Sequence, residues 1–203
     1  MYAEGEYDLA GFAVGVVDRH RVVDGSAIRE GDAVLGLASS GLHSNGYSLA
    51  RMVFLETAGW KLEDGADQLG ETLGEILLRP TRIYVKAVRI ALATKAVRGM
   101  CHVTGGGLPG NLPRILPRGL GVELDPAAWQ RPRVFDIAAE IGAIEKEEMY
   151  RTFNMGIGFV LVVRRQSADS VLRTLRESGE TVWRIGSVHP VQERASEPLV
   201  RFI

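Results

Sequence analysis

The chain has 203 residues, of which 46% are hydrophobic, so it can bury one substantial core within the usual size of a single domain. Its formal net charge of -1 gives no electrostatic case for binding nucleic acid or an anionic membrane, and a small-molecule ligand is the better expectation. Cys101 is the only cysteine, which excludes an internal disulfide; no Cys/His cluster has zinc-ligand spacing, so we expect no metal site. This cysteine usage favours a reducing compartment, so we expect a cytoplasmic protein. We also expect it to be soluble, because residues 1–8 do not resemble a secretory signal and no apolar run approaches the ~20 residues that cross a bilayer.

The first part of the chain predicts strands separated by polar turns. Residues 11–17 form an apolar run between charged residues, which is typical of a buried strand, and residues 21–23 are candidates to pair with it. A turn is predicted at 24–26. Residues 33–38 then predict another buried strand, which ends in a loop of small residues at 39–46.

Helical spacing begins after this loop. Apolar residues recur at the intervals of an amphipathic helix, Arg79-Pro80 is a stop signal, and Thr81 can cap the helix that follows. An acidic stretch at 61–70 predicts an exposed connection. The predicted helices cover residues 47–57, 71–78 and 81–96.

Strands and helices continue to alternate in the second half. Pro109 and Pro113 permit only a short or kinked helix that ends near Leu116. The charged tail from Pro190 is expected to be peripheral. Because the elements interleave without a repeat, the sequence predicts a single α/β domain over residues 1–203, a sandwich of helices on a mixed sheet. Strands are predicted at 100–103, 122–124, 157–163 and 181–188, and helices at 133–141 and 167–177.

Three loops carry the residues with the clearest chemical potential. In the first, His43, Ser44 and Asn45 stand at the start of a helix, whose dipole favours an anion, although Ser44 or Asn45 can equally be an ordinary helix cap. The choice is open at this level.

The second loop contains Thr104, Gly105, Gly106 and Gly107. Three consecutive glycines let backbone amides approach phosphate oxygens without a Cβ in the way. The loop lacks the ending of a Walker motif and the dinucleotide-binding pattern. A tight turn with close helix packing is the alternative interpretation.

The third loop places Arg151, Thr152 and Asn154 just before a buried strand. These groups can orient a polar ligand at the sheet edge, or simply pair with one another. His43 and His102 are candidate proton carriers, although a single loop histidine is more often a capping residue.

Several motifs occur in the order found in one enzyme family. The chain resembles the aminoimidazole ribonucleotide synthetase family, also called the phosphoribosylformylglycinamidine cyclo-ligase or PurM family, up to His189. The carrying motifs are GEYDLAGF at 5–12, SSGLHSNGYS at 39–48, PTRIYVK at 80–86, HVTGGG at 102–107 and EMYRTFNMG at 148–156.

This resemblance implies a PurM C-terminal-domain-like fold and a defined reaction. ATP activates the formyl amide oxygen of formylglycinamidine ribonucleotide, an amidine nitrogen attacks, and phosphate leaves as the imidazole closes. It implies phosphate or ribose contacts from Ser44, Asn45 and the loop at 104–107, and substrate contacts from Arg151, Thr152 and Asn154. His43 is the candidate proton carrier, and Asn154 is grouped with it as catalytic.

The resemblance also implies a missing part. Family members carry about as much sequence again upstream, in a domain that holds much of the ATP and Mg²⁺ site and builds a homodimer. Its absence predicts either a truncated chain or the product of a split reading frame, inactive alone and able to self-associate through exposed apolar surface.

Two alternatives accompany this expectation. Other PurM/PurL-superfamily enzymes, such as formylglycinamidine synthetase, selenophosphate synthetase, thiamine phosphate kinase and hydrogenase-maturation proteins, share the general pattern, although the motifs at 80–86 and 151–156 argue against them. A catalytically silent ligand-binding or assembly module is the second alternative.

Overall fold

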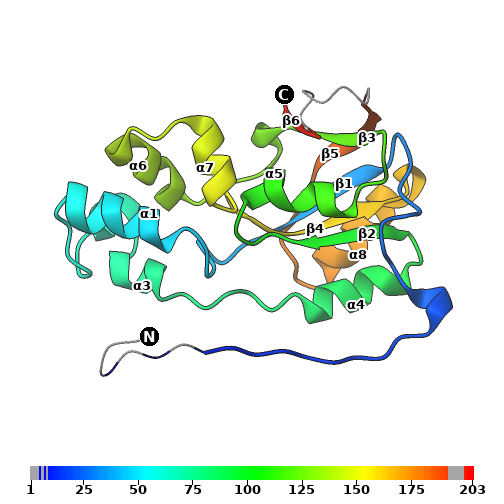
Figure 1. Ribbon diagram of the computed structural model, residues 1–203, viewed down its shortest axis with the longest axis horizontal. Coiled ribbons are helices and arrows are strands. Elements are labelled where there is room, and N and C mark those ends of the chain that lie inside the picture. The colour runs from blue at the N-terminus through cyan, green and yellow to red at the C-terminus, as the bar shows by residue number, and fades with distance from the viewer. Residues whose placement is uncertain (1–4, 6, 8, 192–198) are drawn as a thin grey trace.

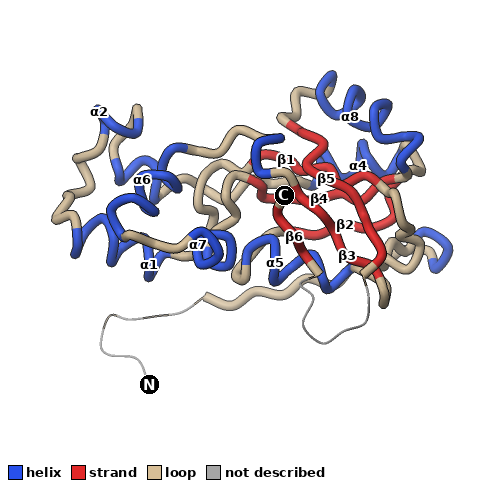
Figure 2. The backbone as a smooth tube through the Cα atoms, turned by 90° about the horizontal axis from the view of Figure 1, so that it is seen from above, coloured by secondary structure: helices blue, strands red, loops and turns tan. Residues whose placement is uncertain are grey.

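The structure, a computed structural model, describes residues 5, 7, 9–191 and 199–203. Its centre is a six-stranded mixed sheet with strand order β2-β4-β1-β5-β3-β6 (Figure 2). Neighbouring strands are antiparallel except β3 and β6, which are parallel. The α/β class and the mixed sheet predicted from the sequence are therefore confirmed. The strands are β1 (Ala33–Ala38), β2 (Val97–His102), β3 (Leu120–Leu124), β4 (Ile157–Val163), β5 (Val182–Pro190) and β6 (Val200–Phe202).

Helices cover both faces of the sheet and extend beyond one of its ends. In Figures 1 and 2, α4 and α8 lie on one face and α5 on the other, whereas α1, α6 and α7 gather beyond the sheet. None of the helices in the described ranges is long and apolar enough to cross a membrane. The α-helices are α1 (Tyr47–Arg51), α2 (Ala66–Leu69), α3 (Leu73–Leu77), α4 (Val85–Ala93), α5 (Gly107–Asn111), α6 (Arg133–Gly142), α7 (Lys146–Thr152) and α8 (Ala168–Glu177).

Short helices of other types complete the chain. A π-helix, η2 (Met52–Thr57), continues α1, so the predicted helix at 47–57 is present as two joined elements. The 3₁₀ helices are η1 (Arg19–Arg21), η3 (Leu112–Ile115), η4 (Pro126–Ala128) and η5 (Arg165–Ser167).

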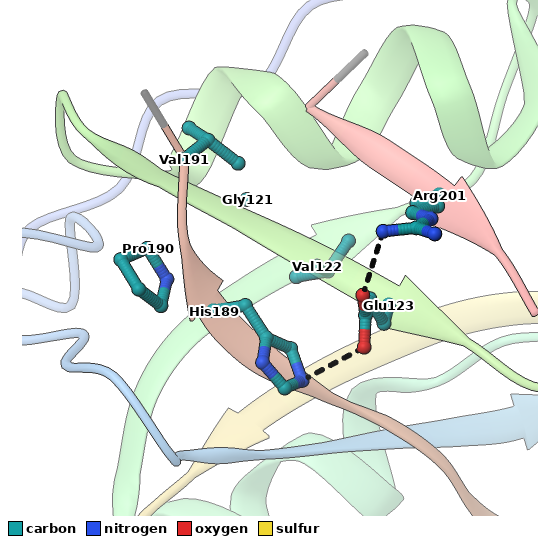
Figure 3. Close-up of a pocket in the computed structure, with 7 residues that line it drawn as sticks. All are labelled: Gly121, Val122, Glu123, His189, Pro190, Val191 and Arg201. Carbon is teal, nitrogen blue, oxygen red and sulfur yellow. Dashed lines mark hydrogen bonds and ion pairs between the residues drawn. The ribbon is translucent and has the colours of Figure 1, made fainter. Parts of the chain in front are cut away.

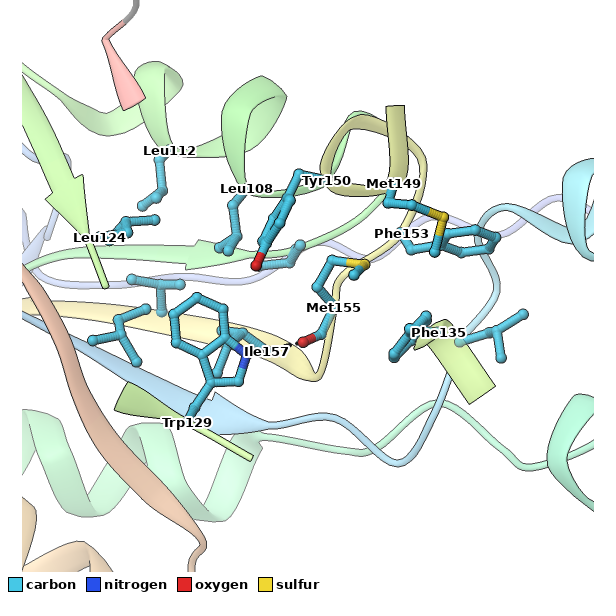
Figure 4. Close-up of a cluster of buried hydrophobic side chains, with 14 of the residues drawn as sticks. Leu108, Leu112, Leu124, Trp129, Phe135, Met149, Tyr150, Phe153, Met155 and Ile157 are labelled. Atoms are coloured by element: carbon cyan, nitrogen blue, oxygen red, sulfur yellow. Dashed lines mark hydrogen bonds between the residues drawn. The ribbon is translucent and has the colours of Figure 1, made fainter. Parts of the chain in front are cut away.

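The central strands are buried on both faces because successive side chains point to opposite sides. In β1, Val34 belongs to the larger core cluster, whereas Ala33 and Leu35 belong to the cluster beneath α4 and α8. Figure 4 shows part of the larger cluster, in which the Trp129 indole N–H donates to the Met155 carbonyl at 2.9 Å. The continuous apolar runs in the sequence follow from this two-sided burial.

The segment before η1 differs from the prediction. Residues 11–17 are extended but pair with no described strand, and Phe12 and Val14 are 95% and 87% exposed. Figure 1 shows this segment running along the outside of the molecule. The predicted buried strand is wrong for the described fold, as is its pairing with 21–23, because no neighbouring strand supplies hydrogen bonds or cover. The motif at 5–12 lies partly outside the described residues.

Other differences concern element ends. The helix predicted at 81–96 begins only at Val85. Residues 81–84 lie outside any helix or strand, and the Tyr84 hydroxyl donates to the Ala38 carbonyl at 2.7 Å. Helix α7 was not predicted. The C-terminal end is not peripheral: Val200 is buried and β6 pairs with β3. Residues 192–198 of the predicted tail lie outside the described residues.

Candidate functional site

Three loops meet at one end of the sheet. The pairing of Ala38 with Ile157, and of His102 with Phe159, puts the ends of β1 and β2 beside the beginning of antiparallel β4. The loops at 39–46, 103–106 and 153–156 therefore lie together, although they are far apart in the sequence. The three segments predicted to carry chemistry form one region of the molecule.

The first and third loops are joined by Asn154. Its side-chain amide donates to the Gly41 carbonyl at 2.8 Å, and its Oδ1 accepts the Gly156 amide at 2.8 Å. Asn154 is buried, so both of its polar atoms are satisfied inside the protein. Its geometry fits a residue that holds the first loop in place.

Gly46 allows the same two loops to touch. It has a φ of 77°, and a Cβ there would lie only 2.6 Å from Cδ1 of Phe153. A larger residue is excluded both by the left-handed backbone and by the aromatic ring. The start of α1 is thus seated directly on the end of α7.

The glycines of the second loop have different roles. Gly107 donates its amide to the Thr104 carbonyl at 3.0 Å, and a Cβ on it would lie 2.8 Å from the Phe153 carbonyl oxygen. Gly105 is exposed, and neither its amide nor that of Gly106 has an acceptor among the described residues. Gly107 thus fits the alternative of a tight turn with close helix packing. The backbone amides of Gly105 and Gly106 remain available to donate to a ligand.

Asn111 fixes the shape of this loop. Its side-chain nitrogen donates to the carbonyls of Thr104, Gly105 and Gly107 at 3.2, 3.2 and 2.7 Å, and its Oδ1 is 3.1 Å from the Thr104 hydroxyl. The side chain is buried. Because the carbonyls are turned inward onto Asn111, the loop is held without a ligand.

Polar side chains surround the free amides. The Oδ1 of Asn45 is 3.7 Å from the position of a Cβ on Gly105, so the first two loops adjoin there. The Ser44 and Thr81 hydroxyls are 3.1 Å apart and exposed. Neither Ser44 nor Asn45 makes a side-chain cap bond to α1, whose N-cap is Gly46. The ordinary-cap interpretation of these two residues is therefore not what the geometry shows.

Arg151 and Thr152 share one carboxylate. Glu148 forms an ion pair with Arg151 at 2.5 Å and accepts the Thr152 hydroxyl at 2.7 Å. The Arg151 side chain is 74% exposed, so this pairing is a weak surface interaction that a ligand can replace. Arg151 and Thr152 therefore pair with a carboxylate of their own helix, α7, just before the third loop.

His43 is buried beneath the site. Its Nε2 accepts the Ser40 amide at 3.1 Å, which leaves the proton of the neutral ring on Nδ1, an atom without a hydrogen-bond partner among the described residues. Burial lowers its pKa from 6.5 to about 4, with smaller contributions from His102 and Arg82. The ring is therefore neutral at physiological pH.

An aromatic group that the loops did not reveal surrounds His43. The His43 ring centre lies 6.1 Å from that of Tyr84 and 6.3 Å from that of His102, and His102 stacks on Phe159 at 6.1 Å. A Cβ on Gly158 would lie 2.9 Å from Cζ of Tyr84, so this glycine makes the space for the rings.

Arg82 closes one side of this group. It pairs with Glu180 at 2.6 Å and lies 5.8 Å from the centre of the Tyr84 ring. The motif at 80–86 contained Arg82 and Tyr84 but gave them no role. Their partners come from distant segments: Glu180 is 98 residues from Arg82 in the sequence. No local sequence pattern could therefore have identified this pair.

A separate cavity of about 330 Å³ lies at the other edge of the sheet, against β3, β5 and β6 (Figure 3). Its carboxylate, Glu123, is 3.3 Å from His189 and 3.4 Å from Arg201. These side chains already pair with one another, and none of the three loops contributes to the lining. The candidate site is therefore the loop region and not this cavity.

The fold and the loops define a known class of domain. Residues 29–196 match the family described as AIR synthase related protein, C-terminal domain, and the chain belongs to that family.

Named relatives narrow the comparison. The chain is 54% identical, over all of its length, to the phosphoribosylformylglycinamidine cyclo-ligase of Sorangium cellulosum (strain So ce56), and it covers 59% of that protein. It is 55% identical over 94% of its length to the enzyme of the same name from Pseudothermotoga lettingae, of which it covers 56%. The chain thus spans little more than half of the curated relatives that it matches.

Solved structures share the fold at low sequence identity. A thiamine-monophosphate kinase from Stenotrophomonas maltophilia K279a is 17% identical, with a TM-score of 0.61 over 92% of this chain and 54% of the kinase. A hydrogenase maturation protein HypE is 21% identical, with a TM-score of 0.56 over 92% of this chain and 53% of HypE. These likenesses establish the fold alone and confirm the predicted fold class.

Proposed function

We propose that this chain is the C-terminal half of a phosphoribosylformylglycinamidine cyclo-ligase, which closes the imidazole ring of aminoimidazole ribonucleotide at the expense of ATP in purine synthesis. The identity to relatives of that name over the whole chain supports the proposal. The observation that carries it within the structure is the meeting of three polar loops around the free amides of Gly105 and Gly106.

The reaction needs donors at the points where negative charge develops. Phosphate leaves from the activated formyl amide, so fixed N–H and O–H groups lower the barrier more than mobile water does. We assign phosphate or ribose contacts to Ser44, Asn45, Thr104, Gly105 and Gly106. Gly107 supports these contacts by packing the loop against α7.

The third loop is assigned to the substrate. Arg151 and Thr152 can exchange their shared carboxylate, Glu148, for polar groups of formylglycinamidine ribonucleotide. Asn154 acts through the loop that it holds, and His43 supplies one neutral N–H. A ring with a pKa of about 4 is neutral at physiological pH and a weak base, so we assign it the donation of a hydrogen bond and not the transfer of a proton.

ATP and Mg²⁺ are assigned mainly to a domain upstream of this one. Among the described residues, no group of three or more His, Cys, Asp or Glu side chains is arranged to hold a metal ion. We assign neutral donors and Arg151 to this half, and carboxylate ligands for Mg²⁺ to the upstream domain.

The upstream domain is also the proposed physical partner. Phe12, Val14 and Val16 are almost fully exposed on the extended segment, which offers unused backbone hydrogen-bonding groups and apolar side chains to another sheet. We place the complete enzyme in the cytoplasm and expect it to form a homodimer.

Reconstitution tests the function. Formation of aminoimidazole ribonucleotide from formylglycinamidine ribonucleotide and ATP is measured with this chain alone and with the upstream domain of a close relative added as a second chain. Activity is expected only in the mixture. An inactive complex whose assembly has been verified by sedimentation contradicts the proposal.

The alternatives give different results in the same experiment. Another ATP-dependent enzyme of the superfamily would not form aminoimidazole ribonucleotide in the mixture. It would hydrolyse ATP or transfer its phosphate only when a different acceptor is supplied. A silent assembly module would bind the upstream domain without turnover, even when ATP and the substrate are both bound.

A further inference from the structure

A basic pocket lies at the end of the sheet opposite the three loops. It has a volume of about 410 Å³ and is lined by Asp32, Arg98, Arg164, Arg165 and Gln166. Asp32 precedes β1, Arg98 is near the start of β2, and Arg164 follows β4. The candidate site is at the other ends of these same strands, so the two regions are separated by the length of the sheet.

A buried carboxylate holds one arginine in position. The Nη1 atom of Arg98 is 2.8 and 2.9 Å from the two carboxylate oxygens of Asp32, and the Arg29 amide donates to Asp32 at 2.9 Å. Asp32 is only 3% exposed. The remaining N–H groups of Arg98 have no acceptor among the described residues. They are available to a ligand and lose little side-chain freedom on binding.

Two further arginines bring uncompensated charge. Arg164 and Arg165 are exposed, and neither forms an ion pair in the described part of the chain. Their backbone is fixed, because the Arg164 amide donates to the Ala96 carbonyl at 3.1 Å and its carbonyl accepts the Ser167 amide at 2.9 Å. With Asp32 counted, three arginines and one aspartate leave the lining with a formal charge of +2.

We propose that this pocket binds a multiply charged phosphate-bearing anion. Guanidinium groups match phosphate oxygens in pairs, and Gln166 adds a neutral amide. An anion with two or more negative charges balances the positive charge of the lining, whereas one chloride or one carboxylate leaves part of that charge unbalanced. The site is independent of the proposed enzymatic function, because none of its residues belongs to the three loops.

Calorimetry with inorganic pyrophosphate tests the site on the full chain. The double variant Arg164→Ala, Arg165→Ala is compared with Arg173→Ala, which removes an exposed arginine of α8 that does not line the pocket. We expect the double variant to bind pyrophosphate at least tenfold more weakly and the control to match the unmodified chain. Thermal unfolding checks that both variants are folded.

The loops can also bind pyrophosphate, so the comparison is made at two salt concentrations. If pyrophosphate binds specifically in this pocket, the difference in affinity between the double variant and the control persists at about 150 mM salt. Equal affinities for the two variants, or binding that disappears alike from all three proteins as salt rises, overturns the proposal and leaves an adventitious ion only.

Discussion

At the scale of single residues, adjacent glycines in one motif have separate physical roles. A Cβ on Gly107 would collide with the carbonyls of Tyr150 and Phe153, whereas the nearest atom to a Cβ on Gly105 is the Asn45 Oδ1 at 3.7 Å. The motif HVTGGG marks both residues equally. Only the packing of α7 distinguishes the glycine that supports the fold from the glycine that faces a ligand.

The two glycines make a matched pair of variants. Gly107→Ala combines a φ of 56° with a backbone collision, and we expect it to lower the free energy of unfolding by about 2–4 kcal/mol. Gly105→Ala should change it by less than about 0.5 kcal/mol and still reduce the activity of the reconstituted enzyme. Urea unfolding and the ring-closure assay measure the two effects. Equal stability losses would contradict the division of roles.

His43 predicts a dependence of stability on pH. Its pKa is about 4 in the folded chain and ordinarily 6.5, so the unfolded chain binds more protons between these values. The stability that His43 contributes to the folded chain is complete above pH 6.5 and is lost as the pH falls toward 4. Between pH 6.5 and 5 the loss is at most about 2 kcal/mol.

The variant His43→Gln isolates this contribution. Urea unfolding at pH 6.5 and at pH 5 should show a smaller drop in stability for the variant than for the unmodified chain. The other histidines, His20, His102 and His189, are present in both proteins. Parallel stability curves over this range would show that His43 is not buried in its neutral form.

At the scale of elements, the sequence predicted the central strands well because they are continuous apolar runs. Strands β1, β4 and β5 lie within one or two residues of their predicted bounds. Errors occur where tertiary contacts decide the outcome. Tyr84, whose hydroxyl bonds to the Ala38 carbonyl, precedes α4 instead of lying within it. Strand β6 exists because it pairs with β3, nearly 80 residues away in the sequence.

The last strand yields a stability prediction. Val200 is buried, the Leu199 carbonyl accepts the Val122 amide at 2.8 Å, and the Ile203 amide donates to Leu124 at 3.0 Å. Deleting residues 199–203 should lower the free energy of unfolding by about 2–4 kcal/mol, since it exposes apolar surface and leaves β3 without this partner. Chemical denaturation measures the change. An unaltered midpoint would mean that the end of the chain is peripheral after all.

At the scale of the whole molecule, the sequence predicted which loops form the candidate site better than it predicted the side chains that complete it. The three loops were found because Gly, Ser and Asn cluster at strand ends, which is a local signal. The aromatic group around His43 and the buried bonds of Asn154 could not be found in this way, since Asn154 and Gly41 are 113 residues apart. The pattern at 11–17 correctly indicates extended backbone, but the segment pairs with no described strand.

The exposed segment predicts self-association of the chain when it is alone. Phe12 and Val14 on the segment and Ile83 before α4 are all more than 80% exposed. We expect the sedimentation coefficient to rise with protein concentration and to rise less in the double variant Val14→Ser, Val16→Ser. Leu62→Ser, in the connection before α2, is the control. A monomer at all concentrations would contradict this prediction.

The contact around Gly158 has a consequence for the evolution of the family. Gly158 lets the Tyr84 and His43 rings lie against β4, and a side chain there would displace one of them. The three positions are therefore expected to change together. A lineage that replaces Gly158 should also have lost or reduced one of the two rings, and an alignment of divergent members would record this as correlated substitution.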